Sequence, residues 1–282
     1  MNNINIREIK QVITGLATSD GDGVQLTRVI GTPQLDMLDP FLLLDEFGSN
    51  KPLDYIGGFP SHPHRGFETV TYMLAGKMRH KDSAGNSGVI KPGGVQWMTA
   101  GKGIIHSEMP EQTEGLLAGL QLWVNLPAKH KMTQPKYQEY IAKEVPIEQL
   151  ANEGSINIIA GTTKNGTHGV IKNELINPTY WDVNLNEGSQ FEETIDPNHN
   201  AFIYMLEGEI YVGTQSKVLG KGQLAILKKG KDIIISNQKK SRFVLVAGKP
   251  LNEPVARGGP FVMNTKQQIL DAFADYKNGQ LV

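Results

Sequence analysis

Two short segments decide the fold and the chemistry predicted for this chain: GGFPSHPHRGFE at residues 57–68 and GKGIIHSEMP at residues 101–110. Each carries two potential metal ligands at alternate positions, His62 and His64 in the first and His106 and Glu108 in the second. Successive side chains of a β-strand point to opposite faces, so the two members of each pair share one face. On two facing strands, these pairs converge on one point.

Three imidazoles and one carboxylate form a donor set that suits a divalent first-row metal ion and leaves positions open for water, substrate or dioxygen. The chain has no cysteine, which excludes disulfides, thiolate metal sites and thiol nucleophiles. Any metal centre must therefore use histidine, aspartate and glutamate. The spacing predicts one metal site drawn from the two ligand pairs.

The rest of the sequence has the rhythm of an all-β protein. Short apolar runs are interrupted by Gly, Pro and Asn at intervals of about ten residues, which is typical of a sandwich or barrel and not of alternating strands and helices. Pro63 lies between the first two histidines and cannot donate to a strand ladder. We therefore place this strand at the edge of a sheet, or at its entrance.

An internal repeat predicts two similar domains. The sequence YMLAG at residues 72–76 returns as YMLEG 132 positions later, and IIHSE at residues 104–108 returns as IIISN 129 positions later. At these offsets the second copy replaces the four ligands by Thr194, Asp196, Ile235 and Asn237. We predict domains at residues 1–140 and 141–282, connected near residues 136–146, with the metal site in the first domain only.

One helix is expected, at the C-terminal end. Thr265 and Gln268 form the Thr-x-x-Gln pattern of a capping box, while Ile269, Phe273 and Tyr276 fall on about one face. The pattern predicts a helix over residues 266–277.

The motifs also resemble a known family. His62-x-His64 followed by Glu68, the turn glycine Gly76, and His106 resemble the two motifs of the cupin superfamily. The sequences FPSHPHRGFETV and QWMTAGKGIIHSEMP resemble the pirin branch in particular, and the resemblance extends from LLLDEFG at residues 42–48 to GPFVMNT at residues 259–265. It implies a bicupin, with two antiparallel β-barrels in one chain.

The resemblance also bears on which carboxylate binds the metal. Glu68 matches the general cupin ligand, whereas Glu108 is the ligand that the pirin resemblance implies. We choose Glu108, both as a metal ligand and as the catalytic base. Glu68 on the same interior face would then orient a histidine or a water molecule. Iron(II) is the expected ion, with manganese, nickel, copper and zinc as alternatives because this donor set accepts all of them.

Two functions follow from the resemblance. The first is a metal-dependent dioxygenase of the quercetin 2,3-dioxygenase type, which acts on a flavonol or another chelating enol with dioxygen. The second is a non-catalytic metalloprotein that regulates a protein partner, as a transcriptional or metabolic cofactor. The sequence alone does not separate the two.

Net charge and hydropathy indicate which partners and which cellular location to expect. Lys and Arg number 28 against 29 acidic residues, a net charge of −1, so no global field favours nucleic acid or an anionic membrane. The first residues lack the pattern of a signal peptide, and no apolar run is long enough to cross a bilayer. We expect a cytoplasmic protein.

Four further histidines and two tryptophans are predicted to have no role in the metal site. His80, His130, His168 and His199 have no ligand partner at strand spacing, so we place them on the surface. Trp97 and Trp123 are expected in the core rather than in an aromatic substrate cage.

Overall fold

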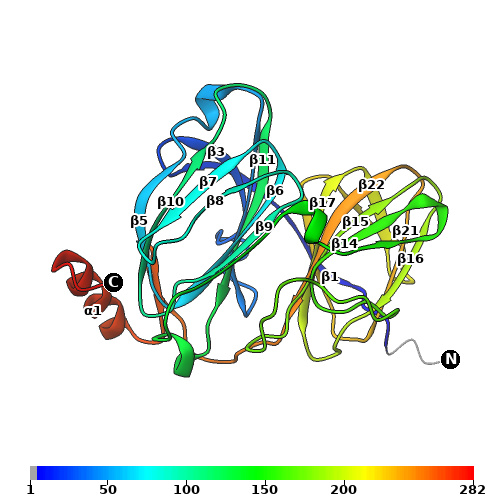
Figure 1. The fold of residues 1–282 in the computed structure, drawn as a ribbon. Coiled ribbons are helices and arrows are strands. Elements are labelled where there is room, and N and C mark those ends of the chain that lie inside the picture. The colour runs from blue at the N-terminus through cyan, green and yellow to red at the C-terminus, as the bar shows by residue number, and fades with distance from the viewer. Residues whose placement is uncertain (1–4) are drawn as a thin grey trace. The chain divides into compact units, whose positions relative to one another are not determined.

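The computed structural model describes residues 5–282, which form two compact units (Figure 1). We call the first the site unit; it comprises Leu16–Ala142 and Leu251–Val282. The second unit comprises the described residues up to Gly15, from residue 5 onward, and Lys143–Pro250. Each unit thus draws on segments that are far apart in the sequence.

The site unit contains two main antiparallel sheets and a small one. Its seven-stranded sheet has the order β12 (Lys136–Tyr140), β9 (Val95–Thr99), β6 (Phe67–Ala75), β11 (Leu117–Asn125), β4 (Phe41–Ser49), β3 (Val24–Ile30) and β2 (Leu16–Asp20). Its four-stranded sheet has the order β5 (Phe59–His64), β10 (Ile104–Pro110), β7 (Met78–Asp82) and β8 (Ser87–Ile90). The small sheet pairs β23 (Ala256–Gly258) with β24 (Phe261–Met263).

The second unit repeats this organisation. Its seven-stranded sheet has the order β1 (Ile9–Thr14), β20 (Gln223–Leu227), β17 (Asn200–Glu207), β22 (Ser241–Gly248), β15 (Thr179–Leu185), β14 (Ser155–Ala160) and β13 (Ile147–Gln149). Its four-stranded sheet has the order β16 (Gln190–Thr194), β21 (Asp232–Ser236), β18 (Glu209–Val212) and β19 (Lys217–Gly220). Short 3₁₀ turns lie at Pro52–Asp54, Ala128–His130, Ala142–Glu144 and Ala151–Glu153.

The all-β, cupin-like prediction is confirmed, but the sheets do not close into the two predicted β-barrels. Each unit is a cupin-like sandwich of two open sheets, and each sheet keeps two edge strands. Both sheets of the second unit contribute to one apolar core, for example Trp181 from the larger sheet and Phe191 from the smaller one. The layers are therefore joined by side-chain packing and not by a continuous ladder of backbone hydrogen bonds.

The predicted domain limits require correction at both ends of the chain. Strand β1 pairs with β20, which places the beginning of the chain in the second unit. The C-terminal segment returns to the site unit, where the Val262 amide donates to the Arg65 carbonyl. The first part of the predicted connection at residues 136–146 is strand β12, which pairs with β9. Long-range strand pairing thus overrides the sequence-contiguous division.

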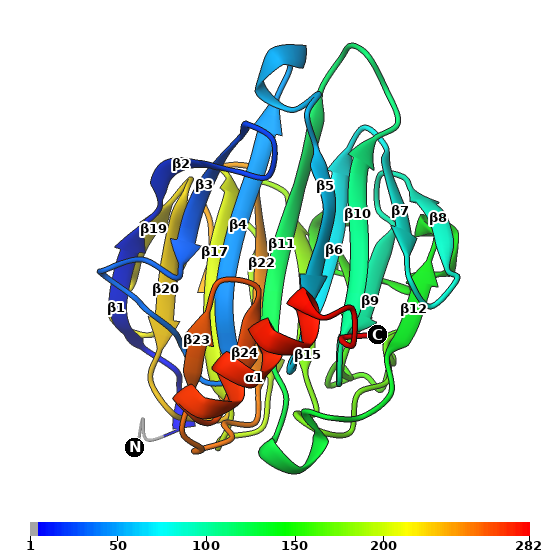
Figure 2. The same ribbon diagram turned by 90° about the vertical axis from the view of Figure 1, so that its left-hand side faces the viewer.

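The predicted helix is confirmed as α1 (Lys266–Lys277), with the capping box of Thr265 and Gln268. Figure 2 shows α1 lying across β23 and β24. Ile269 and Ala272 are buried, and Phe273 and Tyr276, each a little over 40% exposed, keep ring contacts with Phe261 of β24. The predicted face of the helix therefore lies against the site unit.

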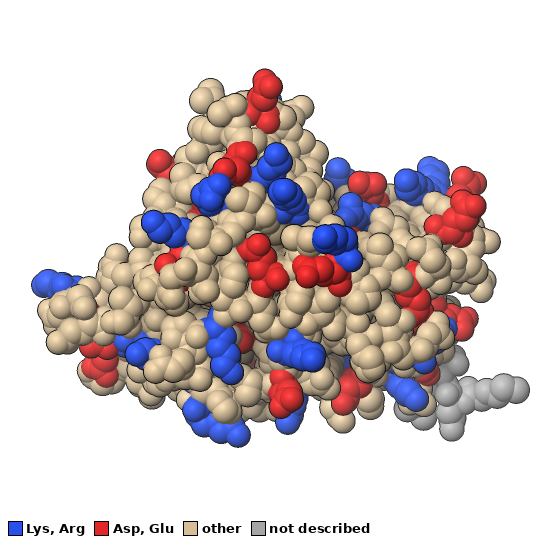
Figure 3. Space-filling view, in the orientation of Figure 1, with Lys and Arg blue, Asp and Glu red and all other residues tan. Residues whose placement is uncertain are grey.

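No helix among residues 5–282 has the length and apolarity needed to cross a bilayer. On the face shown in Figure 3, acidic and basic side chains are interspersed, without a large patch of one sign.

Candidate metal site

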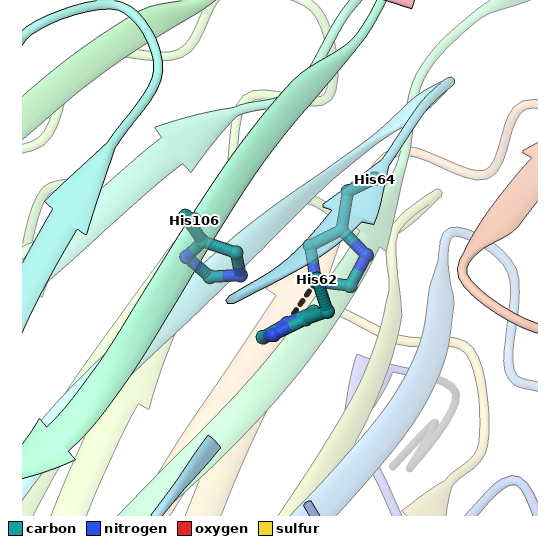
Figure 4. A group of neighbouring side chains, drawn as sticks. All are labelled: His62, His64 and His106. Carbon is teal, nitrogen blue, oxygen red and sulfur yellow. Dashed lines mark hydrogen bonds between the residues drawn. The ribbon is translucent and has the colours of Figure 1, made fainter. Parts of the chain in front are cut away.

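Three of the four predicted ligands come together in the site unit. Strands β5 and β10 pair with His106 opposite His62, and His64 follows two residues along β5 on the same face. One nitrogen from each ring lies within 4.8 Å of the other two, and Figure 4 shows the three rings facing one another. The alternation visible in the sequence therefore does produce a cluster of imidazoles.

The backbone around the cluster explains how it is presented. Strand β5 is the first strand of its sheet, so Pro63 breaks no interior ladder and the edge prediction is confirmed. The pairing of β5 with β10 shifts register between His106 and Glu108. Such bulges commonly occur beside functional sites, because they redirect a side chain.

Hydrogen bonds fix the tautomers of the two β5 histidines. Nδ1 of His62 lies 2.7 Å from the Pro60 carbonyl, and Nδ1 of His64 lies 3.3 Å from the Pro260 carbonyl. Because a carbonyl oxygen only accepts, each Nδ1 donates, and each neutral Nε2 keeps its lone pair. These two Nε2 atoms are 3.0 Å apart.

This geometry fits a bound cation. Two imidazole nitrogens that each lie about 2.1 Å from one metal ion, in adjacent positions, are about 3 Å apart. His106 is buried, and neither of its ring nitrogens has a hydrogen-bond partner among the described residues. A metal ion would satisfy one of those nitrogens and would separate the two facing lone pairs of His62 and His64.

Burial keeps these ligands neutral. Desolvation, together with the charge of His62, lowers the pKa of His64 to about 3. Desolvation and the neighbouring histidines likewise hold the pKa of His106 well below its usual value. Near pH 7 both rings therefore offer lone pairs without first losing a proton.

The fourth predicted ligand lies outside the imidazole group. Glu108 is buried, with Oε1 accepting from the Thr71 hydroxyl at 2.7 Å and Oε2 accepting from the Gln121 amide at 3.3 Å. The alternative carboxylate, Glu68, accepts from Trp97 Nε1 at 3.0 Å and from the Thr99 hydroxyl at 2.7 Å. Glu68 therefore anchors side chains of β9.

A cavity of about 700 Å³ in the site unit reaches His62, His64 and Glu108. Aromatic side chains line it, and Trp123 lies 5.2 Å from His64 between ring centroids. Trp97 is buried as predicted, but Trp123 is a wall residue of this cavity and not simply a core residue. The volume is in the range that accommodates small-molecule ligands.

Two of the histidines assigned to the surface are instead buried. His199 is 4% exposed and lies 3.8 Å from Asp196 in the second unit. His80 is fully buried on β7, where its Nε2 donates to Asp82 at 3.0 Å. The sequence did contain a signal for His80, because His80-x-Asp82 repeats the alternate spacing of His62-x-His64 on a neighbouring strand.

The pairing of β16 with β21 corrects the predicted equivalences in the second unit. Ile235 is opposite Phe191, as His106 is opposite His62, and Ile233 is opposite Glu193, as Ile104 is opposite His64. Both offsets are 129 (191 − 62 and 193 − 64), so Phe191 and Glu193 replace Thr194 and Asp196 in the correspondence. The offset of 132 applies only beyond the following turn, which is three residues longer.

Two sandwiches of this topology, one of them with inward-facing imidazoles, define a two-domain cupin-like protein with a candidate metal site. Residues 23–124 match the Pirin family, and residues 180–282 match the Pirin C-terminal cupin domain. A pirin-like protein of Caulobacter vibrioides is 46% identical over 275 residues, covering 98% of this chain and 99% of that protein. The chain therefore belongs to the pirin family.

Two further proteins also match over most of this chain. Human pirin is 43% identical over 272 residues, covering 93% of this chain and 89% of pirin. The crystal structure of a quercetin 2,3-dioxygenase from Acinetobacter baumannii matches with a TM-score of 0.90 at 35% identity, covering 98% of both chains. The similarity thus includes both units.

Proposed function

We propose that this chain is a metal-dependent dioxygenase of the quercetin 2,3-dioxygenase type, acting on a flavonol or a related chelating enol. The observation that carries the proposal is the cavity of about 700 Å³ whose wall includes both His62 and His64. A purely structural metal needs no such access, because structural sites are typically closed by protein ligands. The similarity to the Acinetobacter enzyme supports the same reaction class.

The cavity wall suits a planar aromatic substrate. Phe47, Phe59 and Trp123 line the cavity, and Arg257 contributes a guanidinium group that lies 3.6 Å from the exposed carboxylate of Asp36. Aromatic faces bind the rings of such a substrate, and a cation attracts its phenolic oxygens.

Under this proposal His62, His64 and His106 hold the metal ion, with Glu108 as the fourth ligand and iron(II) as the expected ion. When bound, the ion polarises the chelating oxygens of the substrate and supplies the redox chemistry for dioxygen. The imidazoles hold the donor set in place, and the cavity wall orients the substrate rings.

We assign proton transfer to Glu108. Its carboxylate borders the cavity and is held by Thr71 and Gln121, which restrict its rotation. An enol that enters the cavity presents a hydroxyl proton to this carboxylate, and loss of that proton strengthens the oxygen as a chelating donor. Glu108→Gln keeps the shape of the side chain but removes its basicity.

The test uses the full chain stripped of metal and reconstituted anaerobically with Fe(II), Mn(II), Ni(II), Cu(II) or Zn(II). Oxygen uptake and loss of flavonol absorbance are then followed together. We expect turnover with at least one redox-active ion and a loss of about 10²-fold or more in Glu108→Gln. If no ion raises the turnover of the wild-type protein above that of Glu108→Gln, the function as a non-catalytic regulator of a protein partner replaces the enzymatic one.

A further inference from the structure

The three imidazoles differ in what holds their second nitrogen. His62 and His64 each donate from Nδ1 to a proline carbonyl. His106 has no comparable acceptor, because both of its ring nitrogens are buried without a partner among the described residues. Figure 4 shows one nitrogen of His106 turned toward His62 and the other turned away. A metal ion satisfies only the nitrogen that faces the cluster.

The neighbouring ring of His80 also has a nitrogen without a hydrogen-bond partner. His80 lies on β7, which pairs with β10, and the centroids of the His80 and His106 rings are 5.4 Å apart. Nδ1 of His80 is also buried without a partner. At this separation, ring nitrogens that face each other would lie about 3 Å apart, which is hydrogen-bond range. The rings are tilted by 51°, so this hydrogen bond requires a rotation about χ2, a torsion with a broad energy minimum.

Asp82 determines what His80 can offer. The Asp82 carboxylate accepts from Nε2 of His80 at 3.0 Å, and it is itself held by the backbone amides of Ala84 and Asn86, each at 3.0 Å. Because Nε2 of His80 donates to this carboxylate, Nδ1 of the neutral ring is an acceptor. The His80 ring also packs against Tyr137 at a centroid distance of 5.0 Å.

We propose that His80 and Asp82 form a positioning pair for His106. In this arrangement Asp82 accepts from His80 Nε2, His80 Nδ1 accepts the N–H of His106 that points away from the cluster, and the remaining His106 nitrogen keeps its lone pair for the metal. Carboxylate–histidine pairs outside the ligand shell orient metal ligands and increase their basicity in this way. The inference rests on the metal site of the proposed function, but not on turnover.

A purely structural role for His80 and Asp82 does not account for the unpaired nitrogen of His80. Asp82 already closes the turn at residues 82–86 through backbone amides, and this needs no histidine. An aliphatic residue on β7 could fill the space between Tyr137 and His106. A fully buried imidazole with an unpaired nitrogen costs about 1–3 kcal/mol unless another group uses that nitrogen.

The test compares His80→Asn with His80→Leu in the full chain. The two side chains have similar shapes, but only asparagine carries an acceptor close to the position of Nδ1. Cobalt(II) is the probe, because its visible absorption reports both affinity and ligand geometry. We expect His80→Leu to weaken cobalt binding by about 10–100-fold and to alter its spectrum, and His80→Asn to restore much of both.

A second measurement needs no metal. In protein labelled with ¹⁵N at histidine, a long-range ¹H–¹⁵N spectrum reports the tautomer of each ring. We expect a single His106 tautomer in the wild-type protein and in His80→Asn, and a mixture in His80→Leu.

Equal cobalt affinity and spectra in the wild-type protein and both variants would overturn the proposal. Equal weakening by asparagine and leucine, with no change in the His106 tautomer, would also overturn it and would indicate packing alone. A failure of the dioxygenase proposal appears separately, as absent oxygen uptake by a wild-type protein that still binds cobalt more tightly than His80→Leu does.

Discussion

The two sandwiches share one architecture but use the same strand positions for opposite purposes. In the site unit, His62 and His106 face each other across β5 and β10. In the second unit, Phe191 and Ile235 hold the corresponding positions and belong to the apolar core. The comparison shows that the sandwich fold does not need a polar cluster at these positions, because the second unit fills them with apolar side chains.

The other two positions show the same divergence. Asn237 replaces Glu108, and its side chain holds a turn: Oδ1 accepts from the Ser189 amide at 2.8 Å and Nδ2 donates to the Lys239 carbonyl at 2.7 Å. Glu193 replaces His64 and accepts from the Lys164 amide at 2.8 Å. Polar groups in the second unit thus stabilise local backbone, whereas those of the site unit converge on one point. We therefore expect substitutions at matched positions to separate metal binding from stability.

The largest expected effect is on metal affinity. His106→Ala removes one of three converging nitrogens, so we expect metal affinity to fall by about 10³-fold or more. The stability of the metal-free protein should change little, because lost packing is offset by the removal of the buried ring nitrogen that has no partner when the metal is absent. Competition titration with a chromophoric chelator and thermal unfolding of the metal-free protein measure the two quantities.

Ile235→Ala is the matched substitution in the second unit, and it should produce the opposite pattern. Removing a buried isoleucine leaves a cavity, so we expect a loss of about 2–5 kcal/mol in the free energy of unfolding. Metal affinity should stay at the wild-type value under conditions where the variant is folded. Urea unfolding and metal titration of the same preparation give both numbers, and a loss of affinity without a loss of stability would contradict the comparison.

Asn237→Ala should destabilise by less, about 1–3 kcal/mol. The substitution leaves the Ser189 amide and the Lys239 carbonyl without their side-chain partner. Glu108→Gln at the matched position retains the side-chain shape, so stability should hold while proposed turnover falls. Equal destabilisation by the two variants, seen in urea midpoints, would show that Glu108 has the same structural role as Asn237.

Per pH unit, the smallest expected effect is a difference in pH dependence. The pKa of His64 is about 3 in the folded protein against an ordinary value of 6.5, so between these values the unfolded chain binds more protons than the folded one. The metal-free protein should therefore lose stability as pH falls from 6.5 toward 3. His64→Gln should reduce this slope by about one proton, or roughly 1.4 kcal/mol per pH unit. If the free energy of unfolding has the same slope against pH in the wild-type protein and in His64→Gln, the burial assigned to His64 is wrong.

Local patterns in the sequence predicted local features well. The capping box gave the limits of α1, and alternation identified the three converging histidines because strand geometry fixes which residues share a face. The edge position of β5 followed from Pro63 for the same reason. Each of these features depends on a few consecutive residues.

Features that depend on distant segments were not predictable. The sequence contained nothing to indicate that β1 pairs with β20, or that α1 packs against β23 and β24. The alternate spacing of His80 and Asp82 was visible in the sequence, but the proximity of His80 to His106 becomes apparent only when β7 lies beside β10. The second-unit equivalences were wrong because a longer turn shifts the repeat offset between β16 and β17, which only strand register reveals.

We expect metal binding to be confined to the imidazole cluster of the site unit. Native mass spectrometry of the full chain, loaded with excess metal and then desalted, counts the bound ions directly. One ion per chain is expected in the wild-type protein, none in the folded double variant His62→Ala/His106→Ala, and one in Ile235→Ala. Two ions in the wild-type protein, or one ion that persists in the double variant, would show that metal also binds outside this cluster.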